Sequence, residues 1–123
     1  MRKVILDTSF ILTCVKQKID FFENIKLMGI EIVIPEQVIS EIKRVSISKK
    51  KQHVREDAKL ALKILETNKF ESIDLGTGHV DKLLLKFAKI NSQTIIATLD
   101  RELKNKSNNR KMIIKEKKRL EIF

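Results

Sequence analysis

The sequence predicts an α/β protein in which helices cover both faces of a mostly parallel sheet, a three-layer α/β/α sandwich. Short aliphatic runs without polar interruption, typical of strands buried on both faces, alternate along the chain with stretches whose apolar residues recur at helical spacing. The 123 residues contain no internal repeat, linker or low-complexity segment. We therefore expect a single domain over residues 1–123, built around a single core.

The strands are predicted from the aliphatic runs. The first run, Val4 to Leu6, ends abruptly in Asp7, and the second is rich in β-branched residues, which favour strands. Together the runs predict strands at 4–6, 30–34, 70–75, 94–98 and 112–114, with a further edge strand at 120–122.

The helices are predicted between these strands, over residues 9–18, 21–28, 36–45, 55–68, 79–90 and 100–106. Gly29 is a good helix-stop residue, and Pro35 suits the first position of the helix that follows it. The polar and strongly basic segment from Ser46 to His53 is the best candidate for a mobile loop.

The composition favours a nucleic-acid partner. The 26 Lys and Arg residues outnumber the 16 Asp and Glu residues, giving a net charge of +10, which attracts polyanions. Trp and Tyr are absent, which argues against reading bases by stacking and favours contacts to phosphates. The single cysteine, Cys14, excludes an intrachain disulfide, and its apolar neighbours predict a buried structural thiol. Without a signal-peptide pattern or a long apolar run, we expect a soluble, cytoplasmic protein with no membrane contact.

Asp7 and Asp100 each come directly after a predicted buried strand. Open α/β sheets bind their ligands at the carboxyl ends of the strands, where strand order reverses. If the first and fourth strands are neighbours, the two aspartates flank one crevice. The competing interpretation is structural, because Asp is also a favoured N-cap and each aspartate precedes a predicted helix.

Glu41 and Asp81 lie on the apolar sides of their predicted helices. Glu41 shares a face with Val38 and Ile42, and Asp81 shares one with Leu84. An ionised carboxylate near a core needs a cation or several hydrogen bonds, or it takes up a proton. The structural alternative for Asp81 is that an acid in the first turn is stabilised by the helix dipole.

The four acids together fit one cluster better than four separate structural roles. Clustered carboxylates without Cys or His ligands suit hard divalent cations, Mg²⁺ or Mn²⁺. Such ions polarise a phosphodiester, activate water and stabilise the leaving oxygen. Metal-assisted hydrolysis of a nucleic acid is therefore the leading hypothesis, with the lysines holding the phosphate backbone.

These residues resemble the PIN-domain ribonucleases over essentially the whole chain. The motifs that carry the resemblance are Leu6-Asp7-Thr8-Ser9, Pro35 to Ile42 with Glu41, Val80-Asp81-Lys82, and Ala97 to Leu103 with Asp100. The resemblance implies a Rossmann-like sheet of order 3-2-1-4-5 and a Mg²⁺- or Mn²⁺-dependent endoribonuclease acting on single-stranded RNA. It implies catalytic metal-site roles for Asp7, Glu41, Asp81 and Asp100, and supporting roles for Ser9, Thr98 and Glu102. The chain's final segment looks most like the branch of rRNA-processing factors in archaea and eukaryotes.

Positively charged residues are hypothesised to contact RNA, although a solvated surface explains them nearly as well; they are Lys49, Lys50, Lys51, Lys82, Arg101 and the tail from Lys115 to Arg119. Two positions depart from the pattern of this branch: Lys82 stands where the branch often has a second acid, and Leu99 stands where it often has Asn. His53 and His79 are expected to be exposed. The resemblance also implies ribosome-assembly factors as partners and a homodimer, since dimers are common among PIN proteins.

Three alternatives stay open at this point. The first is a non-catalytic RNA-binding scaffold with the same fold, favoured if Lys82 weakens metal binding. The second is a toxin-type PIN ribonuclease. The third is a phosphoacceptor signalling domain, which would use Asp74 after the third strand and Lys115 after the last.

Overall fold

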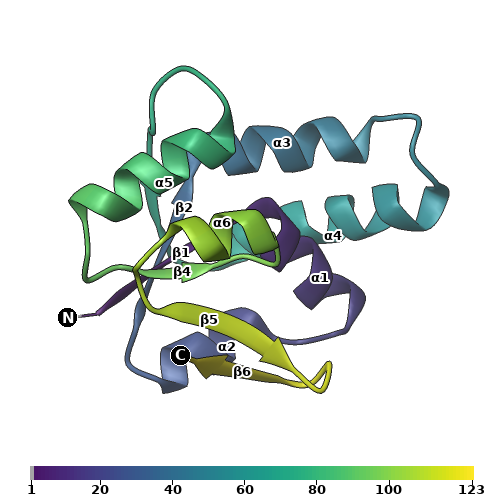
Figure 1. Ribbon diagram of the computed structural model, residues 1–123. Coiled ribbons are helices and arrows are strands. Elements are labelled where there is room, and N and C mark those ends of the chain that lie inside the picture. Colours follow the sequence, from purple (N-terminus) through teal and green to yellow (C-terminus); the bar gives the residue numbers. More distant parts are fainter. Residues whose placement is uncertain (1) are drawn as a thin grey trace.

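The computed structural model describes residues 2–123 and contains a six-stranded sheet of order β3-β2-β1-β4-β5-β6 (Figure 1). Neighbouring strands pair in parallel except β5 and β6, which form an antiparallel hairpin. The predicted order 3-2-1-4-5 is confirmed, with β6 added at the edge. The strands are β1 (Lys3–Leu6), β2 (Glu31–Pro35), β3 (Glu71–Ile73), β4 (Ile95–Ala97), β5 (Lys111–Lys115) and β6 (Arg119–Ile122).

Helices cover both faces of the sheet, as the sequence predicts. They are α1 (Thr8–Lys16), α2 (Phe21–Leu27), α3 (Glu36–Ser46), α4 (Gln52–Thr67), α5 (Val80–Ile90) and α6 (Arg101–Lys106). On one face, apolar residues of α1 to α4 pack with those of the strands around Phe10, which is fully buried. On the other face, α5 and α6 contribute Leu84, Ala88 and Leu103 to a smaller core. The sheet thus separates two apolar layers instead of the single core expected from the sequence.

The middle of the sheet positions the functional edge. β1 is flanked by β2 and β4, with Leu6 opposite Ala97 in the register. Val4, Ile5 and Leu6 are almost completely buried because both faces of β1 are covered. Since β1 and β4 run in the same direction, the residues that follow them emerge at one end of the sheet.

The role of Pro35 and the start of α4 differ from the prediction, whereas α3 begins at Glu36 as predicted. Pro35 is not the first residue of α3: its ψ of 144° is extended, and it closes β2 and serves as the N-cap. α4 begins at Gln52, three residues before the predicted start at 55, because Lys51 provides the first helical carbonyl and Gln52 bonds to Glu56 one turn later. The basic loop is therefore reduced to residues 47–51, and His53 lies in the first turn of a helix.

Cys14 is fully buried in α1, and this burial raises the pKa of its thiol to about 12. The prediction of a buried structural thiol is confirmed by this burial, and a raised pKa disfavours the reactive thiolate. Across residues 2–123, none of the helices has the length and apolarity needed to cross a lipid bilayer.

Candidate active site

Asp7 is held at the end of β1 by donors on both of its carboxylate oxygens. Its Oδ1 accepts from the backbone N–H of Thr8 over 2.8 Å, and its Oδ2 accepts from the Thr98 hydroxyl over 2.8 Å. The Ser9 hydroxyl lies 3.4 Å from the same Oδ2. Only 6% of Asp7 is exposed, so these bonds fix the direction of a nearly buried carboxylate.

Thr98 and Ser9 join the segment after β1 to the segment after β4. The Thr98 hydroxyl accepts from the backbone N–H of Asp100 over 3.1 Å, and the Ser9 hydroxyl accepts from that of Leu99 over 3.1 Å. The two hydroxyls lie 3.4 Å apart. Asp7 and Asp100 are therefore positioned by one hydrogen-bond network, at the edge where the sequence predicts them to meet.

Asp100 caps α6 and keeps one oxygen free. Its Oδ1 accepts from the backbone N–H groups of Glu102 and Leu103, at 2.9 and 3.3 Å. Its Oδ2 makes no hydrogen bond within residues 2–123. Glu102, predicted to support the site, pairs with Lys106 over 2.7 Å on the exposed side of α6.

Glu41 and Asp81 are turned toward the same region. Glu41 is half-buried on α3 beside the buried Ile42. Asp81 is exposed in the first turn of α5, although the sequence predicts it on the apolar side of that helix. Neither takes part in an ion pair or accepts a hydrogen bond within residues 2–123. Their charges, however, act on Asp7, so the structure brings all four predicted acids to one end of the sheet.

The pKa shifts report this crowding. Burial raises the pKa of Asp7, and the charges of Asp81 and Glu41 raise it further, against the lowering effect of Thr98 and Thr8. The pKa of Asp81 is likewise raised by burial and by the charges of Asp100, Glu41 and Glu102, while nearby His79 lowers it. The site concentrates negative charge in a protein of net charge +10.

The donor set fits a hard divalent cation held partly through water. The four acids supply only oxygen atoms, which Mg²⁺ and Mn²⁺ prefer. A cation would favour the ionised forms of Asp7 and Asp81, whose pKa values are raised first by burial and then by the charges of the other acids. Within residues 2–123, no three His, Cys, Asp or Glu side chains converge closely enough to form a ready-made metal site. Mg²⁺ commonly binds through one or two carboxylates and several waters, so direct contact with every acid is not required.

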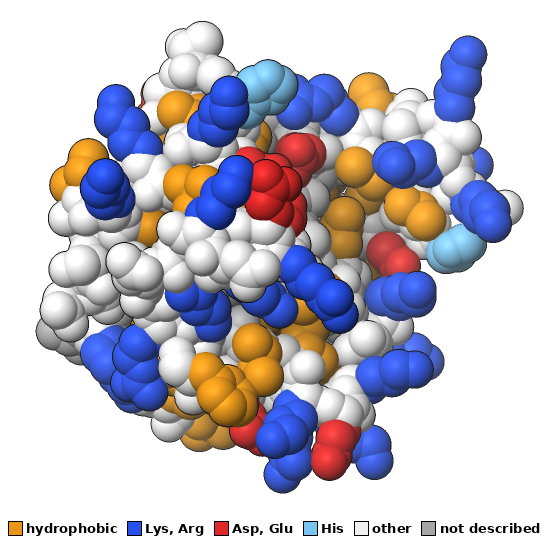
Figure 2. All heavy atoms as spheres, viewed as in Figure 1, with side chains coloured by type: hydrophobic (Ala, Val, Ile, Leu, Met, Phe, Trp, Pro, Cys, Tyr) orange, Lys and Arg blue, Asp and Glu red, His pale blue; other side chains and the backbone are white. Residues whose placement is uncertain are grey.

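Positive charge surrounds the acids. Lys82 and Arg101, two of the predicted RNA contacts, are exposed in the first turns of α5 and α6 next to Asp81 and Asp100. Figure 2 shows acidic side chains gathered near the centre of this face, with Lys and Arg side chains on either side. Three further predicted contacts, Lys49, Lys50 and Lys51, are also exposed and lie in the loop between α3 and α4 (Figure 1).

Gln37 is a residue of the site that sequence reasoning missed. Its amide donates to Asp74 Oδ1 over 2.6 Å and to the Gly76 carbonyl over 2.9 Å, while its Oε1 accepts from the Leu75 N–H over 3.0 Å. These bonds tie the loop that leads into α5 to the helix that carries Glu41. The available signal was its position one turn before Glu41, on the same side of α3.

The residues of the phosphoacceptor alternative are far apart in the sheet. Asp74 follows β3 at one edge, whereas Lys115 ends β5, and three strands lie between β3 and β5. Asp74 is occupied by Gln37 and Gly76, which lower its pKa. Lys115 lies near Glu121, at 3.8 Å. This arrangement does not support phosphoryl transfer to Asp74.

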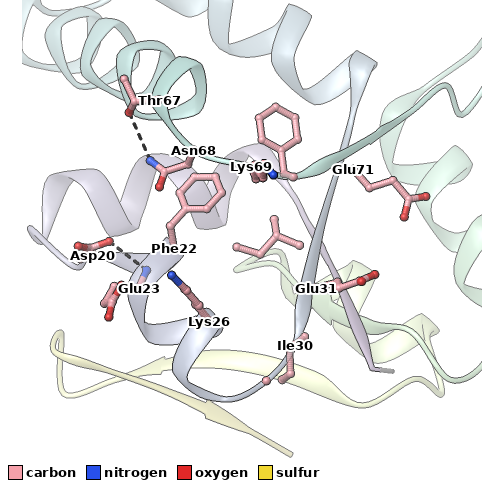
Figure 3. Close-up of a pocket in the computed structure, with 13 residues that line it drawn as sticks. Asp20, Phe22, Glu23, Lys26, Ile30, Glu31, Thr67, Asn68, Lys69 and Glu71 are labelled. Atoms are coloured by element: carbon pink, nitrogen blue, oxygen red, sulfur yellow. Dashed lines mark hydrogen bonds between the residues drawn. The ribbon is translucent and has the colours of Figure 1, made fainter.

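A hollow of about 1050 Å³ has a lining that contains none of the four acids, and Figure 3 shows its lining residues. Phe22 of α2 and Phe70 before β3, with ring centres 6.3 Å apart, form part of its apolar wall. Asp20 and Thr67 lie on its rim, where each makes a local hydrogen bond near the end of a helix. None of the predicted site residues lines this hollow, and its mixture of acids and lysines selects no ligand.

The fold and the acids define the class of protein: an α/β sandwich with a polar site at the carboxyl ends of parallel strands, where strand order reverses. The model of the PIN like domain family matches residues 4–119. The chain belongs to this family, and the resemblance to PIN-domain ribonucleases is confirmed.

Individual relatives agree with this assignment. The chain is 32% identical to Ribonuclease VapC4 of Methanocaldococcus jannaschii over 131 aligned positions, covering 100% of this chain and 98% of the relative. Its structure is similar to that of the PIN domain endonuclease Utp24, with a TM-score of 0.76, 25% identity, and coverage of 97% of this chain and 90% of the other. VapBC2 from Rickettsia felis, solved with a promoter DNA fragment, shares the fold at a TM-score of 0.60 and 21% identity, over 87% of this chain and 95% of the other.

Proposed function

We propose that the protein is a Mg²⁺- or Mn²⁺-dependent endoribonuclease that hydrolyses phosphodiester bonds of single-stranded RNA, and that it acts in RNA processing, with rRNA as the substrate class. The observation that carries the proposal is the network that orients Asp7 and Asp100 from two neighbouring strands, with Glu41 and Asp81 close enough to perturb Asp7. Membership of the family supports the nuclease activity.

Each part of the site has a role in this proposal. Asp7, Glu41, Asp81 and Asp100 would hold the metal ion, directly or through water, and when bound it would supply polarisation of the phosphodiester and activation of water. Thr98 and Ser9 orient the Asp7 carboxylate by hydrogen bonds. The exposed Lys82 and Arg101 are placed to hold phosphates beside the acids. Their positive charge offsets the repulsion between the RNA phosphates and the carboxylates.

The test is cleavage of single-stranded RNA with Mn²⁺ and with a chelator, comparing the wild type with Asp7→Asn and Asp100→Asn. Lys59→Gln is a matched control, because it changes one exposed charge on α4. We expect cutting by the wild type and by Lys59→Gln only when metal is present, and none by the two Asn variants. RNA binding by every protein without cutting in any sample would contradict the proposal and support the scaffold alternative.

A toxin-type ribonuclease is the second candidate, because the 32% identical relative carries the VapC name. The two candidates differ in substrate range and in cost to a host cell. Induced expression of the wild type and of Asp7→Asn, with RNA fragments mapped by sequencing, separates them. Growth arrest that requires Asp7, with cuts in many cellular RNAs, supports the toxin, whereas defined cuts in rRNA precursors without arrest support processing.

A further inference from the structure

Helix α5 leads from the acids to the opposite end of the sheet. Asp81 lies in its first turn, and its last residue, Ile90, is followed closely by β4 from Ile95. Because the strands are parallel, a helix between the end of β3 and the start of β4 runs back along the sheet, from carboxyl ends to amino ends. At 1.5 Å per residue, its 11 residues span about 16 Å.

The exposed side of α5 carries a row of lysines. Lys82, Lys86 and Lys89 stand at i, i+4 and i+7, which places them on one side of the helix, and all three are exposed. The opposite side buries Leu84 and Ala88 against the sheet. No acid follows Asp81 within α5, so the row is not neutralised from its own helix.

A basic hollow lies where the row ends. Its volume is about 430 Å³, and its lining contains Arg2, Lys3 and Arg110 but no acid. Lys3 is paired with Glu71 over 2.8 Å, so Arg2 and Arg110 supply the net charge. Within residues 2–123, the Arg110 side chain forms no ion pair or hydrogen bond. Of the remaining lining residues, Gln93 and Thr94 belong to the segment that connects α5 with β4, and Ile95 is the first residue of β4.

The row points toward the end of the sheet where the hollow lies. In Figure 1, α5 runs toward the left-hand side of the view, where the N-terminus also lies. In Figure 2, Lys and Arg side chains occupy the region of α5 on that side of the acidic group. A linear arrangement of cations suits a ligand with regularly repeated negative charges, which a free anion or a single phosphate does not have.

We propose that Lys82, Lys86, Lys89, Arg110 and Arg2 form a phosphate-binding track along which one arm of the RNA substrate extends from the acids to the amino-terminal end of the sheet. The proposal rests on the proposed function and adds the path of the substrate to it. At about 3.4 Å per nucleotide of a stacked strand, 16 Å of α5 corresponds to about five nucleotides. Shorter RNA reaches the acids without engaging the hollow.

The track is tested by removing three of its charges while leaving Lys82, which adjoins Asp81. The test protein is Lys86→Gln/Lys89→Gln/Arg110→Gln. The control is Lys26→Gln/Lys63→Gln/Lys69→Gln, which removes the same charge from exposed positions on α2, on α4 and before β3. Binding of fluorescent single-stranded RNAs of about 4 and about 16 nucleotides is measured by anisotropy, in chelator, between about 50 and about 200 mM salt. Thermal melts confirm that both proteins are folded.

The expected difference lies in the salt dependence. Each phosphate contact to a single strand contributes about 0.7 to the slope of log K against log salt, so three lost contacts reduce the slope for the longer RNA by about 2. The control should keep the wild-type slope. For the short RNA, the slopes of the wild type, the test protein and the control should differ little. Equal slopes for the test and control proteins would overturn the track, as would an equal loss of slope for the two RNA lengths. Binding of inorganic phosphate at Arg110 that leaves the affinity for RNA unchanged would also overturn it.

The same proteins separate this proposal from the proposed function. Cleavage of the longer RNA with Mn²⁺ is followed in parallel. If the wild type never cuts, but the salt slope of RNA binding is reduced in the test protein and not in the control protein, the track stands and the nuclease proposal fails. If the wild type cuts and the slopes of the test and control proteins are equal, the nuclease proposal stands and the track fails.

Discussion

The substitution Thr98→Val removes one hydroxyl and leaves the size of the side chain nearly unchanged. Thr98 is 0% exposed, and its hydroxyl donates to Asp7 Oδ2 over 2.8 Å and accepts from the Asp100 N–H over 3.1 Å. Valine can form neither bond. The buried carboxylate of Asp7 therefore loses a donor, and the N–H of Asp100 loses its acceptor.

The magnitude follows from these two bonds. A hydrogen bond to a charged group contributes about 1.5 to 3 kcal/mol, and leaving a partly buried N–H unpaired costs about 1 kcal/mol. We expect Thr98→Val to lower the free energy of unfolding by about 3 kcal/mol at neutral pH. This loss is large enough to shift a thermal or urea transition clearly.

The loss should depend on pH. The Thr98 bond lowers the pKa of Asp7, so its removal raises that pKa beyond the increase already caused by burial. The charged part of the bond stabilises the folded state only while Asp7 is ionised. The difference in free energy of unfolding between the wild type and Thr98→Val is therefore largest at pH values above the pKa that Asp7 has in either folded protein. It decreases as the pH falls below these pKa values.

Urea unfolding at a series of pH values measures this difference. Thr98→Ser keeps the hydroxyl and should retain most of the stability. Thr94→Val serves as the stability control, because Thr94 is also buried, at 9% exposure, and its hydroxyl makes no hydrogen bond within residues 2–123. The reasoning is refuted if Thr98→Val costs no more than Thr94→Val, or if its cost is the same at acid and neutral pH.

Three further predictions concern the metal, the α5 loop and the α6 cap. Mn²⁺ at about 100 times its Kd should raise the free energy of unfolding by about 2.7 kcal/mol. Calorimetry should show this gain decreasing as the pH falls through the raised pKa of Asp7, where protons compete with the metal, and absent in Asp7→Asn. Gln37→Ala should lower the free energy of unfolding in urea by about 1 to 2 kcal/mol, and it should weaken Mn²⁺ binding because the loop before Asp81 is no longer held. Gln37→Glu should keep only the bond from the Leu75 N–H. Asp100→Ser should keep the α6 cap, with stability within about 0.5 kcal/mol, yet lose Mn²⁺ binding and cleavage, whereas Asp100→Ala should lose cap, binding and cleavage.

The sequence was informative where position alone determines placement. Asp7 and Asp100 follow buried parallel strands, so strand direction brings them to one edge without any knowledge of side-chain contacts. Glu41 could be identified because helical spacing puts it on the face of α3 that carries Val38 and Ile42, both of which the structure buries completely. These predictions need only the periods of strands and helices.

The sequence was uninformative where placement depends on long-range contacts. Gln37 reaches Asp74 and Gly76, which lie almost forty residues away in the chain, and no local pattern identifies such a partner. The link from Ser9 to the Leu99 N–H depends on the register of β1 and β4. The early start of α4 has a different cause, since Lys and Gln are ordinary helix formers that leave no cap signal in the sequence.

The structural and functional interpretations of the aspartates are compatible, because a carboxylate has two oxygen atoms and about four sites for accepting hydrogen bonds. Asp100 uses Oδ1 to cap α6, and its Oδ2 has no partner within residues 2–123. Capping also orients the second oxygen, since a carboxylate held by two backbone N–H groups cannot rotate freely. The N-cap that the sequence offers as the alternative to a functional role is therefore part of how the fold presents an oxygen ligand, and for Asp7 the bond from Thr8 acts in the same way.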